Sequence, residues 1–447
     1  MSSQSGIPSL PDESVRPLAL ISIMHITAFF GVIGNSGFAL GGLDGTGGEL
    51  QSVVWTFVII AWLLSLGALL LELVRPVYET RYWYWTTIGL TGITSVGIIH
   101  LIYTSGSQEI FTDVILFMRY SADLVMQGQN PYTHSMLPAL DRYSEVTSLP
   151  SVTQRADGSM VSNLSYPALS FLVFLPQRLL GISNISLTVV VFFALSMLIL
   201  VREGPPWLFT VTITVLFFNQ YLVTNSVFGN IDFVWIFLLL LGMGYWYRGQ
   251  LLPAAFVVGL AFAVKPIVWF IGPYVAIWLW KVPEQFGRTR YSAITLSLVA
   301  GFIGFFLPNL PFILDAPSAW LFDVLSAAGS RVPFRTRGTG ISLFAFANIV
   351  NIPTVGFRIL LSGVLVSTLG LYYRYFESVK WVAWVMPAFL LWFNDRSLFN
   401  YFITFAPIAY YAILLNRRIV PKRPLIPSPK TLLQKIGGEQ PDHSDQE

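Results

Sequence analysis

The first segment whose residue types suggest chemistry places a carboxylate beside an apolar run. The chain reads Phe-Thr112-Asp113-Val-Ile and keeps helical spacing as far as Met126, with Gly128 shortly after. Thr112 suits an N-cap and Gly128 suits a stop, so we predict an amphipathic helix lying on the membrane. The helix dipole favours an ionised Asp113, and a general base for a sugar or lipid hydroxyl needs such a carboxylate. Alternatively, Asp113 only charges the helix N-terminus.

A lysine and an Asn-Asp pair supply the next two candidates. Lys265 is the only charged residue deep within the apolar stretch Ala-Phe-Ala-Val-Lys265-Pro-Ile-Val-Trp. A charged side chain in a bilayer usually faces a cavity or a partner, and a phosphate suits an ammonium group. Snorkelling to the interface is the alternative. Asn230 and Asp232 open an earlier apolar run, where they either cap its helix or offer hydrogen bonds to a sugar.

Two further segments carry polar groups between apolar runs. Arg331, Arg335 and Arg337 share a Gly-containing stretch, and guanidinium groups grip a phosphate or diphosphate well. Asn394 begins an Asn-Asp-Arg sequence before the last apolar run. An ordinary solvated loop is the alternative for the first segment, and a turn with an internal Asp–Arg pair is the alternative for the second.

Several other chemistries lack support. The four His stand at 25, 100, 134 and 443 without metal-ligand spacing, and the chain has no Cys. No Walker-type loop, GxSxG elbow or HExxH motif occurs. The net charge of +3 gives no reason to expect nucleic acid as a partner. No cofactor is assigned, and nothing in the sequence supports a divalent cation.

Composition indicates the solvent in which these segments must be positioned. The hydrophobic fraction is 54% and the charged fraction 11%, against roughly 25% charge in soluble domains. The 14 Trp, 19 Tyr and 35 Phe can supply aromatic belts at both membrane interfaces. These numbers predict an all-α, polytopic transmembrane helix bundle in the cell membrane.

Apolar runs and basic residues together predict the topology. The runs cover 18–40, 53–73, 85–103, 166–201, 207–223, 233–247, 251–280, 292–314, 359–373, 381–393 and 398–415. The loops with Arg202, Arg248, Lys281 and Arg374 can all be cytoplasmic together, which leaves the long loop 104–165 outside. We therefore expect about twelve crossings with both termini cytoplasmic. Because Arg248 and Lys281 lie on one side, 251–280 must be a hairpin with its apex near Lys265.

The order of the candidate segments resembles the GT-C superfamily of integral-membrane glycosyltransferases. The resemblance rests first on Asp113 before its helix, on the turn Gly128-Gln-Asn-Pro-Tyr132, and on Tyr166-Pro before the next run. Further on, Gly-Asn230-Ile-Asp232, a basic turn, and Gly-Leu-Ala-Phe-Ala-Val-Lys265-Pro are similar to the polyprenyl-phosphate-mannose-dependent branch. The resemblance divides the chain into 1–84, a tail and two extra spans; 85–415, a catalytic membrane domain; and 416–447, a disordered cytoplasmic tail.

The resemblance implies transfer of a hexose, mannose above all, from a polyprenyl-phosphate donor to a lipid-linked or envelope glycan on the external face, with inversion. Asp113 would be the base, with Glu109 and Asp123 in reserve. The donor phosphate would be held by Lys265, Arg331, Arg335 and Arg337. The sugar and acceptor would be bound by Asn230, Asp232, Tyr132, Tyr166 and Asn394. A secondary transporter and a lipid-linked sugar flippase are the alternatives.

Overall fold

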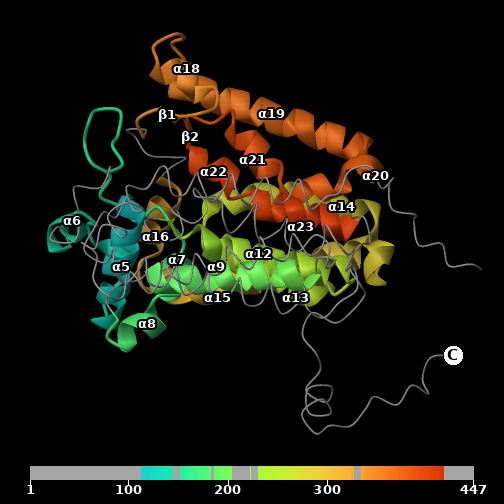
Figure 1. The fold of residues 1–447 in the computed structure, drawn as a ribbon, viewed down its shortest axis with the longest axis horizontal. Coiled ribbons are helices and arrows are strands. Elements are labelled where there is room, and N and C mark those ends of the chain that lie inside the picture. Colours follow the sequence, from blue (N-terminus) through green and yellow to red (C-terminus); the bar gives the residue numbers. More distant parts are fainter. Residues whose placement is uncertain are drawn as a thin grey trace, which may run out of the picture.

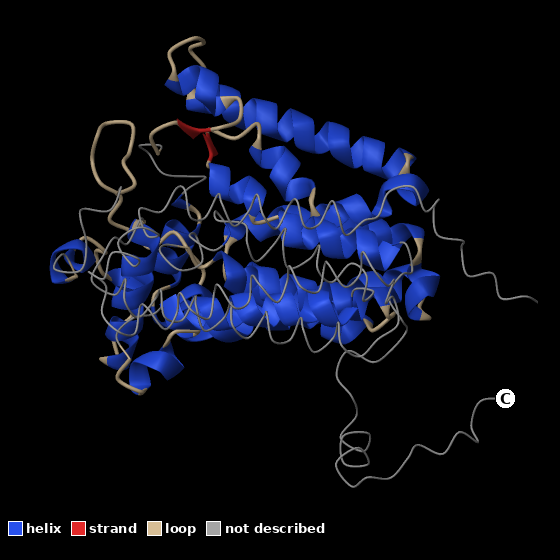
Figure 2. Cartoon of the chain, viewed as in Figure 1, coloured by secondary structure: helices blue, strands red, loops and turns tan. Residues whose placement is uncertain are grey.

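The computed structural model describes residues 112–143, 152–182, 186–203, 222, 230–326 and 334–416. These residues are mainly helical, and strands β1 (Arg337–Gly338) and β2 (Arg396–Ser397) form the one sheet among them (Figure 2). The prediction of a helical fold is confirmed for this part of the chain. The apolar runs at 18–40, 53–73 and 85–103 lie outside it, as does the run at 207–223 apart from residue 222.

The described residues form a series of helices along the chain. In order they are α5 (Asp113–Met126), η2 (Pro131–Thr133), α6 (Pro138–Arg142), α7 (Leu169–Leu172), α8 (Leu175–Leu179), α9 (Ser186–Glu203), α12 (Asp232–Tyr247), α13 (Leu251–Phe262), η6 (Pro266–Ile271), α14 (Gly272–Lys281), η7 (Pro283–Phe286), α15 (Arg290–Asp315), α16 (Pro317–Val324), α18 (Ser342–Phe346), α19 (Thr354–Arg374), α20 (Phe376–Val379), η8 (Lys380–Trp384), α21 (Met386–Leu391), α22 (Phe399–Ile403) and α23 (Ala406–Asn416).

The centre of the fold is a bundle in which α13 packs between α12 and α15, and α12 also packs against α9 and α23 (Figure 1). Glycines allow α13 and α15 to approach closely. A Cβ atom on Gly259 would lie 2.1 Å from the carbonyl oxygen of Gly301, and one on Gly304 would lie 2.1 Å from that of Phe256. Such small-residue crossings are common between membrane helices.

Two of the described helices, α15 and α19, are long and apolar enough to cross a membrane. The apolar run at 251–280 is interrupted at Lys265, as its hairpin geometry predicted, and α13 has only 12 residues. The prediction of a span over 381–393 is not confirmed, because that run divides into η8 and the six-residue α21. At about 1.5 Å per residue neither piece crosses a core of about 30 Å.

Helix α5 lies across one end of this bundle (Figure 1). It has the predicted start and stop, with Thr112 at the N-cap and Gly128 at φ +72° just after its C-terminus. The prediction of an amphipathic surface helix is only partly confirmed. Residues on most sides of α5 are buried, because α6, α7 and α8 pack around it.

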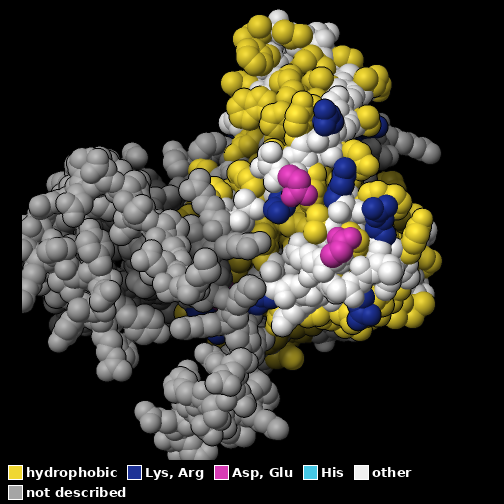
Figure 3. Space-filling view, turned by 90° about the vertical axis from the view of Figure 1, so that its right-hand side faces the viewer, with side chains coloured by type: hydrophobic (Ala, Val, Ile, Leu, Met, Phe, Trp, Pro, Cys, Tyr) yellow, Lys and Arg dark blue, Asp and Glu magenta, His cyan; other side chains and the backbone are white. Residues whose placement is uncertain are grey.

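The opposite end of the bundle gathers the basic connections. Arg248 forms an ion pair with Glu203 at the end of α9, and the Lys281 ammonium lies 3.6 Å from the centre of the Tyr373 ring. Edge-on contacts of the Trp246 ring with Trp278 and with Trp384 hold these connections together. Figure 3 looks onto this end and shows Lys and Arg side chains spread over it. The loops predicted to share one side of the membrane are therefore neighbours in space.

Candidate active site

A cavity of about 1350 Å³ opens at the end of the bundle crossed by α5. Segments far apart in the sequence line it. They are the start of α5, the loop 152–166, the break after α13, the segment 334–339, the start of α19 and the segment 391–401. Some of these segments contribute polar side chains and the rest of the lining is apolar, which is usual for a small-molecule site.

Asp113 lies in the cavity wall at the first turn of α5 and is 5% exposed. Its Oδ2 accepts a hydrogen bond of 2.7 Å from the backbone N–H of Thr153. Within the described part of the chain Oδ1 accepts none. Oδ1 therefore retains a lone pair for an incoming proton. These are the properties of a general base held in one orientation.

Lys265 also lines the cavity, and the hairpin apex holds it in an extended conformation before Pro266. Its ammonium group donates to Asp232 Oδ1 over 2.5 Å and reaches Asn230 Oδ1 at 3.4 Å. The same Oδ1 of Asp232 accepts a hydrogen bond from the indole N–H of Trp235, while Asp232 Oδ2 is buried and has no partner among the described residues. A buried charge must be paired to be tolerated. Lys265 and Asp232 therefore form a fixed pair, of which Lys265 lines the cavity, as Asn230 does, and Asp232 does not.

The two later candidate segments are joined by the small sheet. Arg337 pairs with Arg396 and Gly338 with Ser397 in parallel register. A Cβ atom on Gly340 would lie 2.2 Å from the carbonyl oxygen of Trp392. Glycine is thus required for the backbones to approach this closely. Segments about 60 residues apart in the sequence thereby form one wall of the cavity.

Four arginines stand on that wall. Arg335, Arg337 and Arg396 come from the joined segments and Arg358 from the first turn of α19. In the part of the chain that the structure describes, the guanidinium groups of Arg337, Arg358 and Arg396 form no ion pair or hydrogen bond, and Nε of Arg396 is buried without a partner. Burial raises the pKa of the neighbouring Asp395 carboxyl, while the charges of Arg396 and Arg358 lower it. The wall offers anion-binding groups that the described residues leave largely without ion pairs.

The other predicted residues occupy different positions. Tyr166 and Asn394 line the cavity. Tyr132 is 4% exposed, stacks edge-on against Phe312 at 5.8 Å and donates its hydroxyl proton to the Tyr166 carbonyl at 2.8 Å. It therefore packs behind the wall and positions Tyr166.

The reserve bases lie elsewhere. Asp123 accepts from Tyr143 at 2.6 Å and forms an ion pair of 2.8 Å with Arg178, so its carboxylate is fully engaged away from the cavity lining. Glu109 and Arg331 fall outside the described residues. The structure thus separates Asp113 from Asp123, although both belong to one helix.

Sequence reasoning missed several residues near the site. Arg358 and Tyr401 line the cavity from the edges of apolar runs, and the centre of the Tyr401 ring lies 5.2 Å from the Lys265 ammonium. Asp323 in α16 is 5% exposed and accepts from the N–H of Leu164 at 3.2 Å, and burial raises its pKa to about 7. A charged residue next to an apolar run was the one available signal for Arg358.

No cluster of three or more His, Cys, Asp and Glu side chains occurs among the described residues. The chain matches no family model, no curated protein and no solved structure. Its function therefore has to be argued from the geometry of this cavity.

Proposed function

We propose that the chain is a multi-pass membrane glycosyltransferase that transfers a hexose, with mannose the first sugar to test, from polyprenyl phosphate to a lipid-linked or envelope glycan. The observation that carries the proposal is the lining of one cavity. It combines a buried carboxylate, Asp113, with a wall of arginines, and among the described residues Asp113 Oδ1 accepts no hydrogen bond and these arginines form no ion pairs. A base facing an anion site is what transfer from a phosphate donor requires.

The reaction follows from these positions. Asp113 accepts the proton of the acceptor hydroxyl, whose oxygen forms a bond to the anomeric carbon of the donor sugar. The bond from that carbon to the phosphate oxygen breaks with inversion, and polyprenyl phosphate leaves with the electron pair. Arg335, Arg337 and Arg396 stabilise the negative charge that develops on the leaving phosphate. Tyr166 and Asn394 then contact the sugar or the acceptor.

Lys265 has a different role in this proposal from that of a free phosphate ligand. Its ammonium group is already held by Asp232, and Asn230 lies beside it. The pair keeps the start of α12 and the break after α13 in place. Of the two predicted sugar ligands on this segment, Asn230 lines the cavity and can contact sugar hydroxyls, whereas Asp232 does not line it. The donor phosphate is left to the arginine wall.

The positions of the helix ends support a site on the external side of the membrane. Helices α12, α13 and α19 each have one end at the cavity, near Asp232, Lys265 and Arg358, and their other end at the basic connections. Basic connections favour the cytoplasmic side. The cavity then faces outside, where lipid-linked sugars and envelope glycans would meet.

The test is transfer of labelled mannose from polyprenyl-phosphate-mannose in membranes holding the parent chain or Asp113→Asn. The variant should lose transfer by about 10²- to 10⁴-fold, because general-base catalysis is worth that much, while donor binding persists. Asp157→Asn, at an exposed carboxylate, is the control and should transfer at the parent rate. Full transfer by Asp113→Asn would remove Asp113 as the base.

A secondary transporter is the second candidate, and one observation favours it. The chain breaks its helix beside a buried ion pair, between Phe262 and Pro266, and interrupted helices mark transporter sites. Uptake of a sugar phosphate into vesicles without any transfer product would support that reading instead.

A further inference from the structure

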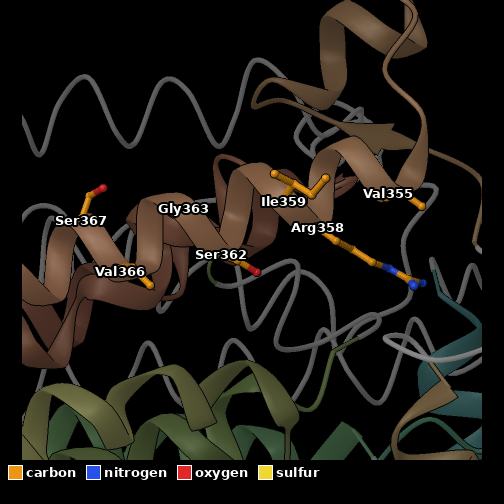
Figure 4. Close-up of a pocket in the computed structure, with 7 residues that line it drawn as sticks. All are labelled: Val355, Arg358, Ile359, Ser362, Gly363, Val366 and Ser367. Carbon is orange, nitrogen blue, oxygen red and sulfur yellow. The ribbon is translucent and has the colours of Figure 1, made fainter.

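A shallow groove of about 680 Å³ runs along one face of α19 (Figure 4). Val355, Ile359 and Val366 line it, together with Arg358, Ser362, Gly363 and Ser367. Spacings of three and four residues place these side chains on one face of the helix. From Val355 to Val366 the groove extends about 16 Å along the helix axis.

The groove is apolar, and the described residues leave it uncovered. Val355, Ile359 and Val366 are 62%, 68% and 69% exposed, and α19 is apolar enough to cross a membrane. Gly363 leaves the floor open, since nothing lies within 4 Å of where its Cβ would stand. An apolar channel of this shape, on a helix long enough to cross a membrane, suits a hydrocarbon chain.

Arg358 connects this groove to the candidate active site. It lines both the groove and the large cavity, and Figure 4 shows its side chain reaching away from the helix. Its guanidinium has no ion pair or hydrogen bond within the described residues, and the buried Nε of Arg396 on the same cavity wall also lacks a partner. Uncommitted donors at the head of an apolar groove favour an anion with an apolar tail.

We propose that the α19 groove holds the hydrocarbon chain of polyprenyl phosphate, with its phosphate bound between Arg358 and Arg396. The proposal rests on the proposed function and adds to it the path of the donor lipid. A face of a single helix accommodates one chain, as in a polyprenyl lipid, rather than the two acyl chains of a glycerophospholipid. The length of the lipid's hydrocarbon chain would then contribute directly to its affinity for the protein.

The experiment uses the full chain in nanodiscs and measures binding by tryptophan fluorescence, without an acceptor. The probes are long-chain polyprenyl phosphate and citronellyl phosphate, which has the same head and a short tail. Gly363→Leu adds a side chain to the groove at a position where nothing lies within 4 Å of the added Cβ. Gly370→Leu is the matched control, because Gly370 belongs to the same helix, has equally open space and does not line the groove.

Gly363→Leu should weaken binding of the long-chain lipid by about tenfold, because it displaces one or two buried methylene groups, and leave citronellyl phosphate unchanged. Gly370→Leu should match the parent with both probes. Arg358→Gln should weaken both probes, since it acts on the shared head. Retained citronellyl phosphate binding shows that Gly363→Leu is folded.

Equal losses in the two glycine variants would overturn the proposal, as would parent-like binding by Gly363→Leu. Displacement of the polyprenyl lipid by an equal concentration of phosphatidylglycerol would overturn it too, because a general lipid site would not distinguish them. The binding experiment needs no acceptor, so it tests the groove separately from sugar transfer. If the lipids bind as predicted but the protein transfers no sugar, the proposed function is refuted and the groove assignment stands.

Discussion

The pairing of Lys265 with Asp232 changes what the most conspicuous charged residue in the sequence is expected to do. Both side chains are at most 4% exposed, and the ammonium donates to a carboxylate oxygen at 2.5 Å. Removing one member of such a pair leaves the other charge buried and uncompensated. The first contribution of Lys265 is therefore to the integrity of the cavity wall.

Lys265→Met should lower the thermal stability of the detergent-solubilised protein by the equivalent of about 3–5 kcal/mol, because Asp232 loses its partner. The double variant Lys265→Met/Asp232→Asn should recover most of that loss. Its Asn oxygen can still accept from Trp235, and no charge stays buried. A single variant as stable as the parent would mean that Lys265 serves a ligand and not the fold.

Asp323 makes stability depend on pH. Its folded pKa of about 7 lies above the ordinary 3.8 because burial disfavours the charged carboxylate. A raised pKa means that the folded state holds the proton more tightly, so this contribution to stability is full below about pH 4 and is lost as the pH rises through 7. Asp323→Asn should remove roughly 4 kcal/mol of that dependence, as measured by thermal unfolding between pH 4 and 8. An unchanged pH profile would contradict it.

At the scale of elements, the crossing of α13 and α15 depends on which glycine is substituted. A Cβ on Gly304 would meet the Phe256 carbonyl oxygen at 2.1 Å, whereas one on Gly301 would make an ordinary contact of 3.5 Å with that of Ala255. Gly304→Ala should therefore destabilise the protein by about 1–3 kcal/mol. Gly301→Ala should be neutral or stabilising by up to about 1 kcal/mol, because alanine favours helix. Thermal unfolding of the two variants, three residues apart on one helix, makes the comparison.

At the scale of the whole molecule, the cavity and the basic connections occupy opposite ends of the bundle. The chain contains no Cys, so a single introduced cysteine reports one position without background. Asp157 in the loop 152–161 and Arg288 between η7 and α15 are both exposed. On intact cells a membrane-impermeant maleimide should label Asp157→Cys and spare Arg288→Cys, and opening the cells should expose the second. The reverse pattern would place the cavity on the cytoplasmic side.

The sequence by itself determined the helical class, the start and stop of α5 and the interruption at Lys265. These features depend on local properties: hydrophobic period, a β-conformation N-cap, a glycine at positive φ, and a charge next to proline in an apolar run. It also identified Asp113, because a carboxylate in the first turn of a helix is a local pattern. The number of crossings stays a prediction.

Only the tertiary structure decided which candidates meet. The pairing of Arg337 with Arg396 joins residues about 60 positions apart in the sequence. Asp113 and Asp123 belong to the same helix, α5, but have different partners in the fold. The tertiary structure also pairs Lys265 with Asp232, packs Tyr132 behind the cavity wall and places Arg358 in the cavity lining. Long-range packing fixes these partners, and no local pattern encodes them, because a charged side chain takes whichever partner the fold leaves beside it.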